Sequence, residues 1–141
     1  MLQESFLKFF NRLRLLQYQE LFGRIKEKDG SLSATEAYAV DVIYLLGNPT
    51  ITKFSETLGI SQPNATYKIN NLVSKGYVIR TVPEGDKREC RISVSEKFFR
   101  YYDVHTRFAD DMRERLEQSY TADEVALFAR MLDTLCREDT P

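Results

Sequence analysis

The sequence predicts a mostly α-helical protein with one small β-hairpin, an α+β fold. Three observations support this. Apolar residues recur at helical spacing through most of the first 75 positions. Residues 77–95 are rich in β-formers and alternate with a period of two after the turn sequence PEGD. Helical spacing then returns from about residue 96 and continues towards the end of the chain.

The first helix is expected over residues 2–27, with apolar side chains on more than one face. A helix of this kind packs against more than one partner. The second helix follows the segment KEKDGS and opens on Ser33, with Glu36 three residues later. This is a capping-box pattern, and Gly47 is the expected stop of the helix.

Two short helices follow with a tight turn between them. Thr50 is placed to cap the segment ITKFSETL, which Gly59 ends. Ser61 caps the next helix, and Pro63 falls in its first turn, where a missing N–H costs little. This spacing is typical of a helix-turn-helix, whose second helix enters the major groove of DNA.

Beyond the hairpin, apolar residues at helical spacing predict one long helix from about Glu96 past Leu116. A last helix is expected after Thr121, because the segment TADE repeats the capping-box pattern.

Bulk composition limits the class of protein. A chain of 141 residues with 43% hydrophobic residues can form one domain with a core. No apolar run approaches the roughly 18 residues of a membrane span. The N-terminal segment MLQESFLKFFNRLRL carries charges and has no small-residue cleavage site, unlike a secretory signal. We therefore expect a cytoplasmic protein with no membrane partner.

Cysteine and histidine are too sparse for a disulfide framework or a zinc site. Cys90 and Cys136 lie far apart without CxxC spacing, and His105 is the single histidine. We expect no metal and no cofactor. Cys90 has the parity of the inward strand positions, so an inert strand cysteine is favoured over a redox sensor, and both interpretations stay open.

Charge is unevenly distributed along the chain. The net charge is −1, which by itself argues against a nucleic-acid binder. Residues 61–97, however, hold seven basic against four acidic side chains, a balance of +3, whereas residues 98–141 hold six against ten, a balance of −4. An acidic scaffold with a basic segment in its middle suits a DNA-binding protein.

The helix that begins after Ser61 has two contrasting faces. At about 100° per residue, Ala65, Ile69 and Leu72 form one packing face. The other side carries hydrogen-bonding residues and no carboxylate. Such side chains can bond base edges or phosphates in the major groove. The alternative is an ordinary solvated helix face. The outward and flanking residues are Gln62, Pro63, Asn64, Thr66, Tyr67, Lys68, Asn70 and Asn71.

The hairpin favours DNA binding over that alternative. The segment PEGDKRECR places Lys87, Arg88 and Arg91 at or near its turn, where long cationic side chains reach the minor groove or the DNA backbone. Surface loops are often charged, and acidic residues share this one. A helix-turn-helix followed directly by a basic hairpin is nevertheless the order of a winged helix.

The chain resembles the MarR family of bacterial winged-helix regulators over essentially its full length. The resemblance lies in FSETLGISQPNATYKINNLVSKGYVIR and in the wing pattern D-x-R-x-x-x-[IV]-x-[LV]-[ST]. The wing pattern is met by Asp86, Arg88, Ile92, Val94 and Ser95. Family members commonly have an arginine at the position of Tyr67.

The resemblance implies a winged helix-turn-helix with long N- and C-terminal dimerisation helices. Residues 31–95 would form the winged helix, and residues 1–30 and 96–141 the helical dimerisation region of a homodimer. Recognition helices would enter successive major grooves, and Arg88, oriented by Asp86, would enter the minor groove. Such regulators are usually repressors released by a small molecule.

Composition supports the dimer independently. Eight of the nine phenylalanines lie outside the predicted DNA-reading module, and a monomer of this size would struggle to cover them all. These eight are Phe6, Phe9, Phe10, Phe22, Phe98, Phe99, Phe108 and Phe128.

The predicted function is a sequence-specific DNA-binding transcriptional regulator, a homodimeric repressor released by a small ligand. Its partner would be double-stranded DNA with a pseudo-palindromic operator, whose half-sites lie about 10 bp apart or a multiple of that. The predicted DNA-binding residues are Ser61, Gln62, Pro63, Asn64, Thr66, Tyr67, Lys68, Asn71, Lys87, Arg88 and Arg91. An aromatic or acyl effector would contact Tyr38, Asp41, Tyr101 and His105.

Two other functions rival this prediction. An enzyme is disfavoured because no GxSxG, P-loop, HExxH or GxGxxG motif occurs and one histidine leaves little acid–base machinery. The second rival is a winged-helix module that binds proteins and not DNA. A steep loss of affinity with salt would separate a DNA reader from such a module.

Overall fold

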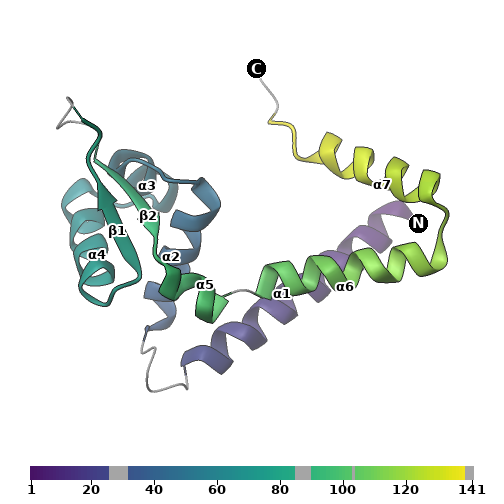
Figure 1. Cartoon of the computed structure of the whole chain (residues 1–141), viewed down its shortest axis with the longest axis horizontal. Helices are drawn as coiled ribbons and strands as arrows, with labels where there is room; N and C mark the ends of the chain where they lie inside the picture. The colour runs from purple at the N-terminus through teal and green to yellow at the C-terminus, as the bar shows by residue number, and fades with distance from the viewer. Residues whose placement is uncertain (26–31, 85–89, 103, 139–141) are drawn as a thin grey trace. The chain divides into compact units, whose positions relative to one another are not determined.

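The computed structural model describes residues 1–25, 32–84, 90–102 and 104–138. They form two compact units, residues 1–102 and residues 103–141. The fold is mostly helical with one β-hairpin, as predicted (Figure 1). In chain order the elements are α1 (Leu2–Ile25), α2 (Ala34–Leu46), α3 (Ile51–Leu58), α4 (Gln62–Ser74), β1 (Val78–Thr81), β2 (Arg91–Val94), α5 (Glu96–Tyr102), α6 (Val104–Ser119) and α7 (Ala122–Leu135).

The predicted caps define where the short helices begin and end. Ser33 and Glu36 form the reciprocal capping box of α2. The Thr50 hydroxyl accepts from the Lys53 N–H at 3.1 Å and begins α3. Gly47 and Gly59 end α2 and α3 with φ of 66°, a left-handed conformation that glycine adopts without strain.

The two strands form an antiparallel hairpin beside α4 (Figure 1). Val78 pairs with Val94, and Arg80 pairs with Ile92. The backbone also joins the hairpin to the loop between α2 and α3, because the Ile92 N–H donates to the Pro49 carbonyl at 3.0 Å. The hairpin is therefore part of the helical core and not a separate appendage.

One hydrophobic core holds α2, α3, α4, the hairpin and α5 together. Phe54 of α3 and Ile69 of α4 are completely buried in it. The buried residues come from every one of these elements, so the position of α4 is set by packing on several sides. The core consists of Leu32, Ala37, Ala39, Val40, Ile43, Phe54, Ala65, Ile69, Leu72, Tyr77, Val78, Ile92 and Phe98.

Phe98 corrects an expectation drawn from the sequence. Phe98 was expected to be one of the phenylalanines that only a dimer would cover. Instead it is 1% exposed within the chain, and its ring centroid lies 5.1 Å from that of Tyr44 in α2. The structure describes helix on both sides of residue 103, as α5 up to Tyr102 and as α6 from Val104. Residue 103 itself lies outside the described residues, so the single long helix predicted from Glu96 past Leu116 stays a prediction. Phe98 is part of the hydrophobic core of the first unit, whereas α6 belongs to the second unit.

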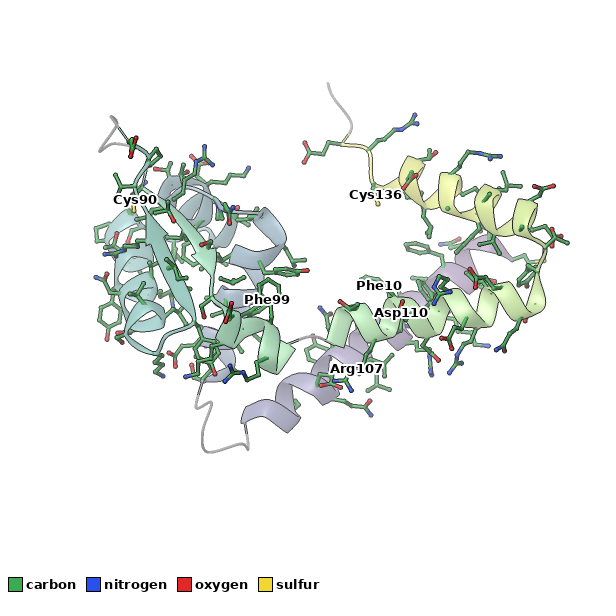
Figure 2. The ribbon with its side chains drawn as sticks, in the orientation of Figure 1. Phe10, Cys90, Phe99, Arg107, Asp110 and Cys136 are labelled. Carbon is green, nitrogen blue, oxygen red and sulfur yellow. The ribbon has the colours of Figure 1, made fainter. Side chains whose placement is uncertain are left out.

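The helices α1 and α7 leave many apolar side chains exposed. Figure 2 shows one of them, Phe10, on α1. The α7 helix has no buried residue, although the Thr121–Glu124 capping box forms as predicted. Among the described residues, no helix combines the length and the apolar character that crossing a membrane demands. The exposed large apolar residues of the two helices are Leu2, Phe6, Leu7, Phe10, Leu15, Tyr18 and Phe22 of α1, and Leu127, Phe128, Met131, Leu132 and Leu135 of α7.

Candidate nucleic-acid interface

The outward face of α4 is the centre of the candidate interface. Ala65, Ile69 and Leu72 are completely buried, as the helical spacing predicts. On the opposite side Tyr67 is 66% exposed, and the remaining predicted contacts of this helix are exposed or half-buried. The exposed ones are Ser61, Gln62, Pro63 and Asn64, and the half-buried ones are Thr66, Lys68 and Asn71. These exposed and half-buried residues of α4, which we call the strip, therefore point away from the core, as expected.

The N-terminal end of α4 favours negative charge. The Ser61 hydroxyl accepts from the Asn64 N–H at 3.3 Å, and the first turn contains no acidic residue. The partial positive charge of a helix N-terminus attracts anions. Since residues 61–75 contain no carboxylate, no side chain of the strip repels a phosphate.

Gln62 connects the two helices of the helix-turn-helix. Its amide Nε2 donates to the Thr52 hydroxyl of α3 at 2.7 Å. Sequence reasoning assigned Gln62 to DNA and missed this contact with Thr52. The bond fixes the amide, so its orientation at the exposed start of α4 is set before any ligand arrives.

The hairpin contributes two arginines that lie in the described part of the chain. Arg91, expected near the tip, is instead the first residue of β2, and its guanidinium donates to the Asn48 carbonyl at 3.1 Å. Arg80 of β1 donates to the side-chain oxygen of Asn70 on α4. Figure 2 shows Cys90 directly before β2, where it is half-buried, as its parity predicts. Lys87 and Arg88 of the predicted wing tip lie outside the described residues, as does Asp86.

The C-terminal end of α4 is held by charged side chains. Lys75 Nζ forms an ion pair with Glu36 Oε2 at 2.8 Å, and Lys97 Nζ donates to the Lys75 carbonyl at 3.0 Å. Partial burial by itself raises the pKa of Glu36. The hydrogen bonds from Lys75 and Ser33 outweigh that effect, so the pKa lies below its ordinary value of 4.5.

The predicted effector residues are not brought together by the described contacts. Tyr38 is exposed and Asp41 is half-buried, three residues apart on α2. Tyr101 and His105 belong to α5 and α6, and their side chains lie outside the described part of the structure. The effector site therefore stays a prediction. In the described ranges, no three histidine, cysteine or acidic side chains are grouped in a way that could hold a metal ion.

An exposed second helix, a tight turn and a following hairpin define a winged helix-turn-helix protein. Residues 31–89 match the family model described as MarR family. This segment of the chain, which holds the helix-turn-helix and the first strand of the hairpin, is therefore similar to that family. A comparison with curated proteins gives no match for the sequence.

Solved structures share the fold over most of the chain. FabT from Streptococcus pneumoniae in complex with DNA is 24% identical, with a TM-score of 0.60 over 95% of this chain and 92% of that one. A mutant MepR from S. aureus, bound to an oligodeoxyribonucleotide, is 18% identical with a TM-score of 0.54 over 92% and 97%. A mutant MarR from E. coli, complexed with operator DNA, is 22% identical with a TM-score of 0.50 over 90% and 93%.

Proposed function

We propose that this protein is a MarR-family DNA-binding transcriptional regulator, which binds a pseudo-palindromic operator as a homodimer and represses transcription until a small aromatic or acyl effector releases it. In this proposal α4 enters the major groove, and the wing, with Lys87 and Arg88, contacts the neighbouring minor groove or backbone. The protein would act in the cytoplasm and catalyse no reaction.

The observation that carries the DNA-binding proposal is the exposed face of α4. It presents an amide, a hydroxyl and an ammonium group from Asn64, Tyr67 and Lys68, on a helix whose other face is buried. Amides bond adenine bidentately, and lysine contacts phosphate or guanine. Because residues 61–75 contain no carboxylate, no side chain of this helix would repel the DNA phosphates.

The homodimer is supported by the apolar surface of α1 and α7. Phe6 and Phe10 of α1 stack with ring centroids 6.3 Å apart, yet both rings remain about half exposed. Large exposed apolar side chains on two helices mark an interaction surface. A second copy of the chain is the economical partner, because an identical partner also supplies the second recognition helix that a pseudo-palindrome requires.

Release by an effector rests on the resemblance to the family and on the aromatic residues near α2. Tyr38 and Tyr44 of α2 are both partly exposed, and Tyr44 contacts Phe98 and Phe99 of α5. Aromatic surfaces of this kind suit an apolar ligand. Tyr101 and His105 remain proposed contacts of that ligand.

The test is a binding titration with duplex DNA from upstream of the protein's own gene, compared with a shuffled duplex. Fluorescence anisotropy at several salt concentrations should show operator binding that weakens steeply with salt. Tyr67→Ala and Asn64→Ala should weaken operator binding by about tenfold or more, and should reduce its advantage over the shuffled duplex. Val73→Ala, a truncation on the flank of the same helix, is the matched control.

Two results would count against the proposal. Failure to bind any duplex at low salt would favour a protein-binding winged helix. Equal affinity for both duplexes would contradict sequence-specific regulation, even if binding depended on salt.

A further inference from the structure

We propose that Asn70 and Arg80 form a preset phosphate-binding pair at the edge of the α4 face, which we call the Asn70–Arg80 clamp. This inference rests on the proposed function, since it assumes that a duplex lies along α4. Arg80 was not among the DNA contacts predicted from the sequence, because it lies in a strand and not at the wing tip.

The hairpin register directs Arg80 towards α4. Arg80 pairs with Ile92, and directly paired residues of an antiparallel hairpin project from the same face. Ile92 is completely buried in the core and Val78, two residues before Arg80, is also buried. Arg80 therefore leaves β1 on the core-facing side, but its side chain reaches past the core and remains exposed.

Asn70 holds the guanidinium of Arg80 beside the outward face of α4. At about 100° per residue, Asn70 lies roughly 20° from Pro63 and 60° from Tyr67 around the helix, so it belongs to the same outward stripe. Its side-chain oxygen accepts the hydrogen bond from Arg80. The hydrogen bond to Asn70 thus already orders the long arginine side chain at the face of α4, so less conformational entropy is lost when it binds an anion.

The chemistry of the clamp favours an anion with several oxygens. Asn70 is a neutral partner, so it orients the guanidinium without cancelling its charge. Among the carboxylates that the structure describes, none forms an ion pair with Arg80. A guanidinium has five N–H donors, and the amide nitrogen of Asn70 adds two more, so donors remain available for phosphate oxygens.

Three other described cations near the C-terminal end of α4 and in the hairpin have partners elsewhere in the fold. Lys75 pairs with Glu36, and Arg91 donates to the Asn48 carbonyl. Lys97 donates to the Lys75 carbonyl and lies 4.6 Å from the ring centroid of Tyr77. Arg80 is distinguished from them because its partner is itself a residue of the outward face of α4.

A phosphate contact has a characteristic signature. It positions the protein on the duplex without reading sequence, so its loss weakens binding to operator and shuffled duplexes by a similar factor. It also releases counterions, so its removal lowers the slope of log affinity against log salt by about one.

The experiment measures affinity and salt slope for the wild-type chain and five variants. Arg80→Ala should weaken binding to both duplexes by about tenfold and lower the slope by about one. Arg80→Lys should recover part of the affinity and the slope, since it keeps the charge but loses the planar fork. Arg113→Ala, which removes an exposed arginine of α6, controls for the change in net charge.

Asn70→Asp separates phosphate binding from a merely structural role. An aspartate would pair more strongly with Arg80 and keep the fold, but it would neutralise the guanidinium and repel phosphate. We expect a larger loss of DNA affinity than for Asn70→Ala, with a melting temperature at or above that of the wild type.

The outcomes distinguish this inference from the proposed function. If the wild type binds DNA with steep salt dependence, but Arg80→Ala and Asn70→Asp keep its affinity and slope, the clamp is overturned and the proposed function stands. If Arg80→Ala weakens operator binding alone, Arg80 reads bases and the phosphate assignment is wrong. A wild-type protein that binds no duplex overturns both.

Discussion

Lys75 Nζ lies 2.8 Å from Glu36 Oε2, so an ion pair joins the C-terminal cap of α4 to the first turn of α2. The same lysine accepts a hydrogen bond at its carbonyl from Lys97, in the first turn of α5. Two further bonds from Ser95 reinforce this corner, to the carbonyls of Gly76 and Tyr77. The C-terminal end of α4 is therefore held from both sides, which would lower the entropic cost of the proposed DNA binding.

The Glu36–Lys75 pair should make stability depend on pH. The pKa of Glu36 is lowered in the folded state, so its stabilising contribution is complete above the ordinary value of 4.5 and is lost as pH falls through the lowered pKa. Glu36→Gln keeps a capping acceptor but not the charge. It should cost about 0.5 kcal/mol of unfolding free energy at pH 7. Urea titrations from pH 7 to about pH 3.5 should show this difference shrinking, and a difference independent of pH would contradict the assignment.

The Thr50 cap should contribute measurably to stability. Thr50→Ala removes the acceptor for the Lys53 N–H and should lower the unfolding free energy by about 1 kcal/mol. Thr57→Ala in the same helix is the matched control. Its hydroxyl donates to the Lys53 carbonyl within the helix, and its removal should change stability by less than about 0.5 kcal/mol. Chemical denaturation followed by circular dichroism measures both, and equal effects would show that the cap is unimportant.

Two neighbouring phenylalanines, Phe98 and Phe99, should contribute very differently to the free energy of unfolding. Phe98 is 1% exposed in the core, whereas Phe99 is 49% exposed. Phe98→Ala should cost about 3–5 kcal/mol because it opens a cavity, and Phe99→Ala should cost far less. Thermal unfolding of the two variants compares them directly. Similar melting temperatures would mean that α5 is not anchored in the winged-helix core.

Charge on the exposed face of α1 should disrupt the proposed dimer. Phe6→Glu combined with Phe10→Glu would place two carboxylates where the proposal has an apolar interface, at a cost of several kcal/mol in association. Size-exclusion chromatography with light scattering should report a monomer at micromolar concentration, against a dimer for the wild type. Ile79→Glu alters an equally exposed apolar side chain of β1 and should remain dimeric. A wild-type monomer would contradict the homodimer itself.

Local signals in the sequence were sufficient to predict most helix limits. Ser33, Thr50, Ser61 and Thr121 begin α2, α3, α4 and α7 as predicted, because a capping side chain bonds N–H groups only two or three residues away. The buried stripe of Ala65, Ile69 and Leu72 was predictable for a similar reason, since helical periodicity alone decides which residues share a face.

Contacts between distant residues were decided by the tertiary structure. Nothing in the local pattern distinguishes Phe98 from Phe99, or shows that Arg80 reaches Asn70 and that Arg91 bonds the Asn48 carbonyl. Each of these depends on how the hairpin and α5 pack on the helices, because packing brings together side chains that the chain itself separates. The sequence alone thus determined the elements, their order and the exposed face of α4. Only the assembled core decided that Lys75 and Arg91 hold the fold together and that Arg80 joins Asn70 at that face.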